Sequence, residues 1–394
     1  MLRYLTAGES HGKALVAILE GFPAGLVIQR ELIESRLASR QSGYGRGARM
    51  KIERDRVEFL SGVRDGRTMG TPIAMLIPNR DWENWQKVMA PFEADPAAIE
   101  QKTIHRPRPG HADLAGALKY MHPDMRNVLE RASARETAAR TAVGALAELL
   151  LFEFGMSAAA HVIRIGDVAT GKPRLATKLI EAAAEKSPVR CADTAVAREM
   201  MKAIDRAASA GDTLGGVVET IVSRVPPGLG SHVQFDRKLD TRLAAAIMSV
   251  PAIKAVEIGD GVLLGQLRGS QAQDEIYYSK AKGDRTAGFY RKTNHAGGIE
   301  GGISNGEDIV VRATMKPIPT LGKPLRSVNM RTRKPSAAAF ERSDVCAVPA
   351  ASVIVRAVAI IEIANAMSEK FGGDTVEEMR RNLAGYLGAI KELR

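Results

Sequence analysis

The stretch Gly8-Glu9-Ser10-His11-Gly12 lies between two apolar segments near the start of the sequence. Residues 1–6 form a short apolar segment before it, and the run 14–19 after it predicts a β-strand. Glycine on each side lets the backbone turn tightly and leaves space for a ligand beside the histidine. We therefore expect a strand to deliver His11 to a site whose other residues come from elsewhere in the sequence.

The composition is that of a globular protein, with 394 residues, 45% hydrophobic and 26% charged. Cys191 and Cys346 lie far apart without metal-ligand spacing, which predicts structural cysteines, no metal site and a reducing compartment. The longest apolar run, 345–367, contains Arg356 and Glu362 at helical period, which indicates a buried core helix and no membrane span. Without a basic-then-apolar signal pattern, we expect a cytoplasmic protein.

The net charge of +11 and the sequence pI near 9.7 suit nucleic acid, an anionic membrane or an anionic small ligand. Aromatic residues make up only 5% of the chain, which leaves few platforms for stacking single-stranded bases. The arginines cluster among glycines and prolines instead of forming a basic tail. We therefore expect a small, highly charged ligand in a pocket and no nucleic acid; a nucleic-acid-binding protein is the alternative hypothesis.

Residues 40–49 read Arg40-Gln41-Ser42-Gly43-Tyr44-Gly45-Arg46-Gly47-Ala48-Arg49 and combine three arginines with three glycines. This pattern predicts a mobile loop that closes over a phosphate or carboxylate group. A solvated basic loop is the alternative interpretation.

Residues 105–113 read His105-Arg106-Pro107-Arg108-Pro109-Gly110-His111-Ala112-Asp113. The prolines stiffen the backbone while the loop displays two histidines and two arginines. A histidine exchanges protons near neutral pH, and Asp113 is close enough in sequence to tune one. A structural histidine is the alternative.

A long helix is predicted over residues 126–154. Arg131 and Arg135 are four residues apart and share a face of that helix, with Ser133 close to it. Neighbouring alanines leave room for a flat ligand. The alternative is a solvated charge ladder that includes Glu130.

The other elements alternate without a linker or repeat, so we expect a single domain over 1–394. Strands 57–62 and 71–77 must pair antiparallel because their connection is short. Segment 79–98 is predicted to be a surface excursion with a helix over 82–89, and we assign it no function. Further helices are predicted over 30–39, 176–185, 195–210 and 240–250, and further strands over 161–165, 215–225, 253–258 and 308–315.

Three later stretches also suggest a site. The glycine cluster at 294–306 suits a flat cofactor or a phosphate tail, but it is no dinucleotide fingerprint. The two prolines of Lys316-Pro317-Ile318-Pro319-Thr320 make that loop a rigid wall. Arg342-Ser343-Asp344 precedes the apolar helix, where charged groups are costly unless they are paired or used.

Together these motifs resemble the chorismate synthase family over essentially the whole chain. The motifs that carry the resemblance follow the family's order: residues 8–12, 43–47, 106–113, 133–137, 316–320 and 342–344. The resemblance implies an α+β fold, a β-α-β sandwich in which two antiparallel sheets enclose central helices. It also implies a homotetramer that converts 5-enolpyruvylshikimate 3-phosphate to chorismate by anti-1,4 elimination of phosphate, with reduced FMN and no net redox change.

The resemblance also assigns residues. His11 matches the acid for the departing phosphate, His111 the histidine beside the flavin, and Asp344 the aspartate that works with the flavin in removing the ring proton. Substrate-binding positions are Arg40, Arg46, Arg49, Arg108, Ser133 and Arg135. FMN-binding positions are Arg131, Ala132, Ser133, Pro251, Ala252, Gly301, Lys316, Pro317, Ile318, Pro319, Thr320 and Arg342.

Arg40 and Arg46 are also the positions given to NADPH in the family, which makes NADPH a candidate reductant for the flavin. Three positions depart from the common family pattern: Pro251, Ala132 and Val345. A proline has no N–H, so Pro251 offers the flavin only a carbonyl or its ring face. A phosphatase with a nucleophilic His11 is the remaining alternative function.

Overall fold

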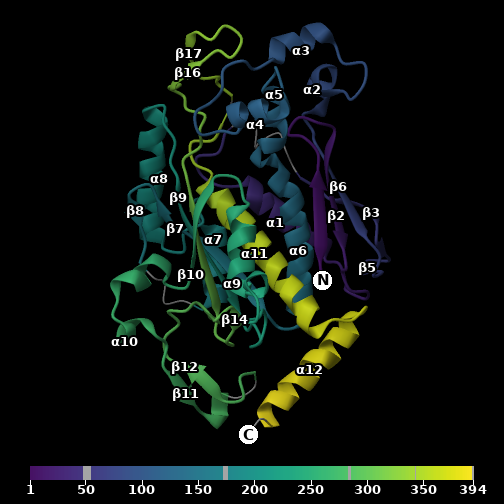
Figure 1. Ribbon diagram of the computed structural model, residues 1–394, viewed down its shortest axis with the longest axis vertical. Helices are drawn as coiled ribbons and strands as arrows, with labels where there is room; N and C mark the ends of the chain where they lie inside the picture. The colour runs from purple at the N-terminus through teal and green to yellow at the C-terminus, as the bar shows by residue number, and fades with distance from the viewer. Residues whose placement is uncertain (48–54, 172–175, 283–284, 342, 393–394) are drawn as a thin grey trace.

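The computed structural model describes residues 1–47, 55–171, 176–282, 285–341 and 343–392 (Figure 1). Two predicted site residues, Arg49 and Arg342, lie outside these ranges. The helices are α1 Arg30–Gln41, α2 Trp82–Met89, α3 Pro96–Lys102, α4 Asp113–Tyr120, α5 Arg126–Ala132, α6 Thr137–Glu153, α7 Thr177–Lys186, α8 Thr194–Ser209, α9 Leu239–Met248, α10 Gly269–Ala272, α11 Val348–Phe371 and α12 Val376–Glu392.

The described residues form two larger sheets, both with antiparallel neighbours. The first has the order β1-β2-β6-β3, formed by Arg3–Ala7, Ala14–Glu20, Ile73–Pro78 and Glu58–Ser61. The second has the order β10-β15-β9-β7-β8, formed by Ile253–Ile258, Ile309–Met315, Gly216–Ser223, Ser157–Ile165 and Val168–Ala169. The predicted antiparallel pairing of the strands near residues 57–62 and 71–77 is confirmed by β3 and β6.

Four two-stranded ribbons complete the strands in the part of the chain that the structure describes. They are β4 Val63–Arg64 with β5 Arg67–Thr68, β11 Ile276–Tyr278 with β12 Phe289–Arg291, β13 Ile299–Glu300 with β14 Ile303–Ser304, and β16 Arg326–Val328 with β17 Pro335–Ala337. Mixed helices and antiparallel sheets make this an α+β fold, as predicted.

Two long apolar helices form the centre of the core. Helix α6 packs against β1, β2 and β6 of the first sheet, and α11 packs against β7, β9 and β15 of the second. The two helices also pack against each other, and α1 contacts both (Figure 1). Helix α11 is apolar on nearly every face, which is typical of a helix that is surrounded by protein. Of its most hydrophobic 18-residue stretch, 89% is buried. The predicted core helix is therefore confirmed.

A buried ion cluster joins three of these helices. Glu148 of α6 accepts hydrogen bonds from Arg36 Nε of α1 at 3.0 Å and from Arg356 Nη1 of α11 at 2.9 Å. Burial by itself raises the pKa of Glu148, but the charge of Arg356 and the hydrogen bonds and charge of Arg36 lower it overall. Removing one partner from such a cluster leaves an uncompensated buried charge, so the cluster fixes how the three helices sit together.

The long helix predicted over 126–154 is interrupted, which corrects that prediction. Ser133 is extended at φ −66° and ψ 140°, and a short 3₁₀ turn over Ala134–Glu136 leads into α6. The Ser133 hydroxyl accepts a hydrogen bond from the backbone N–H of Arg135, and such local bonding competes with helix continuation. As a result, Arg131 and Arg135 do not share a helix face.

The contact between α6 and α11 is close enough to require glycine at one position. A Cβ added at Gly144 of α6 would lie 2.5 Å from Ala357 Cβ and 2.8 Å from its Cα. We predict that Gly144→Ala lowers the free energy of unfolding by about 1–3 kcal/mol, because the helices must separate. Gly385→Ala in α12 is the matched control: its Cβ would meet nothing within 4 Å, so stability should stay level or rise by about 0.5–1 kcal/mol.

Urea unfolding of both variants measures the two effects. Equal stability of Gly144→Ala and the wild-type chain would contradict this close packing.

Candidate active site

His11 lies in the connection between β1 and β2 and is held by residue 130 of α5. The His11 backbone N–H donates to Glu130 Oε2 at 2.8 Å, and His11 Nδ1 lies 2.9 Å from Glu130 Oε1. The Ser10 backbone N–H also donates to the Glu130 carbonyl at 2.9 Å. His11 is only 8% exposed. The glycine-flanked stretch is therefore fixed to α5, which places the imidazole in a defined position.

Glu130 is ionised in this setting. Burial alone raises its pKa, but hydrogen bonds from His11 and the charges of His11 and Arg126 lower the pKa overall. Arg126 Nη1 lies 3.3 Å from Glu130 Oε1, and Arg126 Nη2 donates to Glu341 at 3.0 Å. Because a carboxylate only accepts hydrogen bonds, His11 must donate from Nδ1–H.

Two predicted arginines share one buried carboxylate that the sequence analysis did not identify. Arg135 Nη1 donates to both oxygens of Asp55 at 2.7 and 2.8 Å, and Arg40 Nη1 reaches Asp55 at 3.4 Å. Burial lowers the pKa of Arg40 to about 10, with Asp55 opposing the shift and the charges of Arg135 and Arg46 adding to it. Two guanidinium groups against one carboxylate leave this part of the site positive.

Asn79 connects the arginine pair to the His11 stretch. Its Oδ1 accepts from Arg135 Nε at 2.9 Å, while its Nδ2 donates to the Gly12 carbonyl at 2.7 Å. The Ser133 and Ser10 hydroxyls lie 3.2 Å apart on the same side. The structure therefore brings His11, Ser133, Arg40 and Arg135 together.

Asp344 is paired with the glycine-rich loop, as the cost of a charge beside an apolar helix requires. Its Oδ2 lies 2.9 Å from Arg46 Nη1, and its Oδ1 accepts from the Gly47 N–H at 2.6 Å. The following turn also buries Cys346, whose thiol pKa burial raises to about 11. That cysteine is structural, as predicted.

The loop at 105–113 forms a second cluster, centred on Asp113. Arg108 Nε donates to Asp113 Oδ2 at 2.8 Å, and His111 Nδ1 lies 2.6 Å from Asp113 Oδ1. Burial raises the pKa of Asp113, but hydrogen bonds from His111 and Arg108 hold it well below its usual range. Asp113, which was predicted to influence a histidine of this loop, is therefore in contact with His111. Arg108 Nη1 also donates to the Thr320 hydroxyl at 3.1 Å.

Ser343 joins the two clusters, since its hydroxyl donates to the Thr320 carbonyl at 2.9 Å and the next residue is Asp344. This chain of contacts links His111 with Asp344 and Arg46. His11, Arg40 and Arg135 form the other group, around Glu130, Asn79 and Asp55.

The residues predicted to bind FMN are more widely spread in the fold than those predicted to bind the substrate. Lys316 donates its backbone N–H to the Ala252 carbonyl at 2.9 Å, and its ammonium group donates to the Gly110 carbonyl. Pro251 precedes Ala252, whose φ is +69°. Pro317 is exposed, Pro319 is half-buried, and the Ile318 carbonyl accepts from Thr213 at 2.8 Å. Ala132 ends α5.

Arg131 and Gly301 lie apart from that group. Arg131 Nη1 donates to the Gly8 carbonyl at 3.1 Å on an exposed surface. Gly301 lies in the β13–β14 turn, beside Gly302, whose carbonyl accepts from Leu239 at the start of α9. Ala252 follows the other end of α9, which is about 15 Å long for its ten residues. Gly301 and Ala252 are therefore separated by the length of that helix.

Four contributors to the site were not predicted: Asp55, Asn79, Trp85 and Glu130. The Trp85 indole stacks on the His11 imidazole, with ring centroids 3.9 Å apart. Only Glu130 had a signal in the sequence, because Arg126 and Glu130 are spaced four apart. The other three come from segments distant in sequence, and only the tertiary fold brings them to the site.

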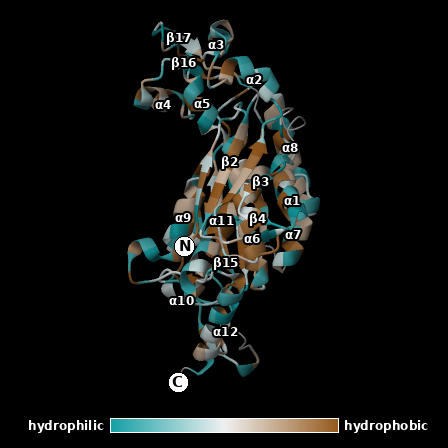
Figure 2. Cartoon of the chain, turned by 90° about the vertical axis from the view of Figure 1, so that its right-hand side faces the viewer, coloured by the Kyte–Doolittle hydropathy of each residue, from teal (hydrophilic) through white to brown (hydrophobic). Residues whose placement is uncertain are grey.

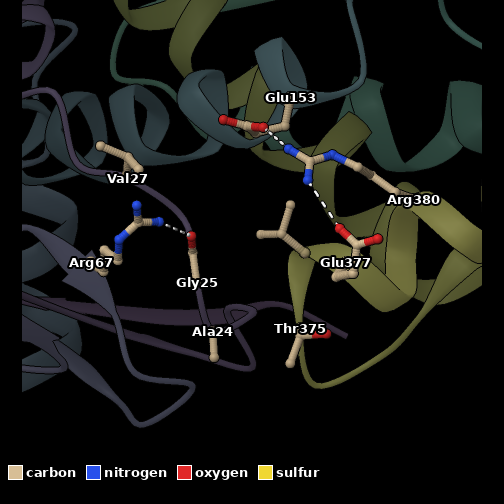
Figure 3. A pocket seen from close by; sticks show the side chains of 9 residues that line it. Ala24, Gly25, Val27, Arg67, Glu153, Thr375, Glu377 and Arg380 are labelled. Atoms are coloured by element: carbon tan, nitrogen blue, oxygen red, sulfur yellow. Dashed lines mark hydrogen bonds and ion pairs between the residues drawn. The ribbon is translucent and has the colours of Figure 1, made fainter.

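A pocket of about 320 Å³ lies elsewhere, between the loop at Ala24–Val27 and the start of α12. Arg380 bridges Glu153 and Glu377 at its rim, and Arg67 donates to the Gly25 carbonyl at 3.3 Å (Figure 3). None of the predicted site residues that the structure describes lines this pocket.

Buried arginines beside two histidines define an enzyme site for a small ligand rich in phosphate or carboxylate groups. Comparison with known proteins specifies the enzyme. A family model described as chorismate synthase matches residues 2–368, and the chain belongs to that family. It is a phosphate-eliminating lyase of the shikimate pathway to aromatic amino acids.

The similarity extends over whole proteins. The chorismate synthase of Pelobacter propionicus is 57% identical over 395 residues and covers all of both chains. That of Symbiobacterium thermophilum is 58% identical over 394 residues, covering 99% of both. A solved structure, "Crystal Structure of Chorismate Synthase", is 40% identical with a TM-score of 0.79 and covers 100% of this chain and 99% of that one.

The Asp113 cluster gives a pH-dependent prediction. Since the folded-state pKa of Asp113 is lowered, its stabilisation is complete above the unfolded value near 4 and is lost as pH falls toward the folded value. Asp113→Asn should cost about 3–5 kcal/mol at pH 6, and this difference should shrink by about 1 kcal/mol at pH 3.

Urea unfolding at both pH values measures the change. The exposed Asp167→Asn variant is the control and should stay within about 0.5 kcal/mol of wild type. A cost for Asp113→Asn that is the same at both pH values would contradict the assignment.

Proposed function

We propose that this site converts 5-enolpyruvylshikimate 3-phosphate to chorismate by an anti-1,4 elimination of phosphate and a ring proton. The observation that carries the proposal is His11, which is fixed through Glu130 beside the positive Arg40–Asp55–Arg135 group. Family membership favours this reaction over the nucleic-acid-binding and phosphatase hypotheses, and no contact in the described residues favours either of those.

The substrate carries one phosphate and two carboxylates, so its binding requires several cationic donors. We assign this binding to Arg40, Arg46, Arg49, Arg108, Ser133 and Arg135. Buried arginines held by Asp55 and Asp113 are oriented before the ligand arrives, which reduces the entropy cost of binding. An anionic substrate also competes with Asp344 for Arg46, and binding then frees that carboxylate.

The proton transfers are assigned to three residues. His11 donates a proton to the departing phosphate, which reduces the charge that builds on the leaving group. Asp344 takes part in removing the ring proton. His111 contacts Asp113 through Nδ1. We assign to its Nε2 the exchange of protons with the flavin.

The residues at the predicted cofactor positions fit a flat group with a phosphate tail. Lys316 and Thr320 offer an ammonium and a hydroxyl group, and a Cβ added at Gly301 would meet nothing within 4 Å. We assign FMN contacts to Arg131, Ala132, Ser133, Pro251, Ala252, Gly301, Arg342 and residues 316–320. Reduced FMN, when bound, supplies electron density as the allylic C–O bond breaks.

NADPH is the proposed reductant, bound at Arg40 and Arg46 at a different time from the substrate because both ligands are anionic. Activity with FMN and NADPH alone, without chemical reductant, would support this role. Dependence on chemically reduced FMN would instead assign reduction to an outside source.

We further propose a single domain with a β-α-β sandwich arrangement, which acts in the cytoplasm as a homotetramer. Packing of α6 on one sheet and of α11 on the other supports the sandwich. The outer face of the first sheet supports assembly, because Leu5 and Ile18 form a cross-strand pair there and are 62% and 43% exposed. Figure 2 faces this sheet and shows apolar colouring along its strands.

An anaerobic assay of phosphate release with chemically reduced FMN tests the reaction. The wild-type chain should release phosphate, whereas His11→Ala should lose about 10²–10⁴-fold in turnover with FMN affinity retained. The control is His232→Ala, an exposed histidine outside the site, which should keep wild-type turnover. No release by wild type, or near-normal release by His11→Ala, would contradict the proposal.

Light scattering tests the assembly. Leu5→Glu and Ile18→Glu should dissociate the tetramer, because each buries an unpaired carboxylate in an apolar interface. Leu179→Glu, at a residue 57% exposed on α7, is the matched control and should leave the mass unchanged. Tetramers in all three variants would exclude this face as the interface.

A further inference from the structure

The His11 imidazole is held on its edge and on its face by two residues that the reaction scheme above does not use. Glu130 contacts Nδ1 with both carboxylate oxygens, at 2.9 and 3.1 Å. The Trp85 indole lies against the ring with an interplanar angle of 26°. One ring nitrogen and one ring face are therefore fixed by the protein.

Trp85 is itself anchored in segment 79–98, for which no function was predicted. Its indole N–H donates to Asp81 at 3.1 Å within the same turn of α2. The Arg126 guanidinium carbon and the Lys102 ammonium lie 5.0 and 5.1 Å from the indole ring centre, within the range of cation–π attraction. The segment therefore has a defined place beside the active-site histidine.

His11 Nε2 makes no hydrogen bond to any residue that the structure describes. With Nδ1–H committed to an ionised carboxylate, the neutral ring must carry its proton on Nδ1 and keep a lone pair on Nε2. When protonated, the ring carries its transferable proton on Nε2. The nitrogen that reacts is thus determined by the partner of the other nitrogen.

We propose that Glu130 is a positioning residue that fixes the Nδ1–H tautomer of His11 and directs Nε2 to the leaving phosphate, while Trp85 holds the ring and excludes water from its face. The inference rests on the proposed role of His11 as the acid. In the step, the Nε2–H bond of His11 breaks and an O–H bond forms on the phosphate. The electron pair of the breaking C–O bond leaves with the oxygen that joined the phosphate to the ring. Neutral Nδ1–H imidazole and ionised Glu130 remain.

The charges around the ring favour this arrangement. Glu130 is the carboxylate in direct contact, and Arg126 and Glu341 lie behind it. Lys102 lies over the Trp85 ring, Asp81 accepts a hydrogen bond from the indole N–H, and Glu9 is two residues from His11 in sequence. A carboxylate in direct contact with the ring stabilises the imidazolium.

The tautomer is tested without reference to activity. Side-chain ¹⁵N chemical shifts of histidine-labelled protein should show His11 with a protonated Nδ1 and an unprotonated Nε2 in the neutral form, with His11→Ala to assign the signals. A neutral ring protonated on Nε2 would overturn the proposal, even if His11→Ala were inactive. Conversely, the predicted tautomer with an active His11→Ala would refute the acid role and leave the positioning geometry intact.

Kinetics test the consequence. Glu130→Gln keeps a hydrogen-bond acceptor but removes the charge, so the alkaline limb of the kcat–pH profile should move about one unit to lower pH. We expect kcat to fall at least about tenfold, and KM to change little. Glu136→Gln, which loses a buried glutamate paired with Arg140, is the control and should keep the wild-type profile. An unmoved limb in Glu130→Gln would contradict the inference.

Two variants of Trp85 test whether its stacking on the His11 ring contributes to catalysis. Trp85→Phe preserves a flat ring and should retain most of kcat, whereas Trp85→Ala should lower kcat with KM little changed. Equal kcat in Trp85→Ala and wild type would remove Trp85 from the proposal.

Discussion

The carboxylate of Glu148 fixes three helices whose ends form one side of the candidate site. It binds Arg36 of α1 and Arg356 of α11 within the core, so α1, α6 and α11 cannot shift independently. Arg40 follows Arg36 by one turn of α1 and donates to Thr137 at the start of α6. Asp344 lies just before α11 and pairs with Arg46. The charged core therefore determines where these site residues meet.

The site is then built from charges that compensate one another. Asp55 separates two guanidinium groups, Asp113 binds an arginine and a histidine, and Glu130 binds His11. Each carboxylate orients its partners and spares them the cost of isolated buried charge. Cationic groups prepared in this way suit a ligand with several anionic groups, and the orientation of His11 suits proton donation at one nitrogen. Elimination of phosphate requires both the cationic groups that bind the substrate and a proton donor in a defined orientation.

Much of the fold was predictable because its signals are local. The hydrophobic period and the length of the apolar runs located α11 and the central strands. The short connection between the strands near residues 57–62 and 71–77 required β3 and β6 to pair antiparallel. The helix break at Ser133 was not predictable, since alanines on both sides favour a continuous helix. At the break the Ser133 hydroxyl accepts from the Arg135 N–H, and the Ser10 N–H donates to the Glu130 carbonyl. In the site, glycine- and proline-rich stretches marked His11, Arg46, Arg108 and His111. Asp55, Asn79 and Trp85 carry no such pattern, and tertiary packing alone brings them to the site.

We propose that His11 Nε2 meets the leaving phosphate while Glu130 holds Nδ1. A crystal structure of the chain with FMN and 5-enolpyruvylshikimate 3-phosphate tests it most directly. We expect a phosphate oxygen about 2.6–3.2 Å from His11 Nε2, with the contact between Nδ1 and Glu130 kept. A phosphate beyond hydrogen-bond reach of Nε2, or a flipped ring that gives up Glu130, would contradict it.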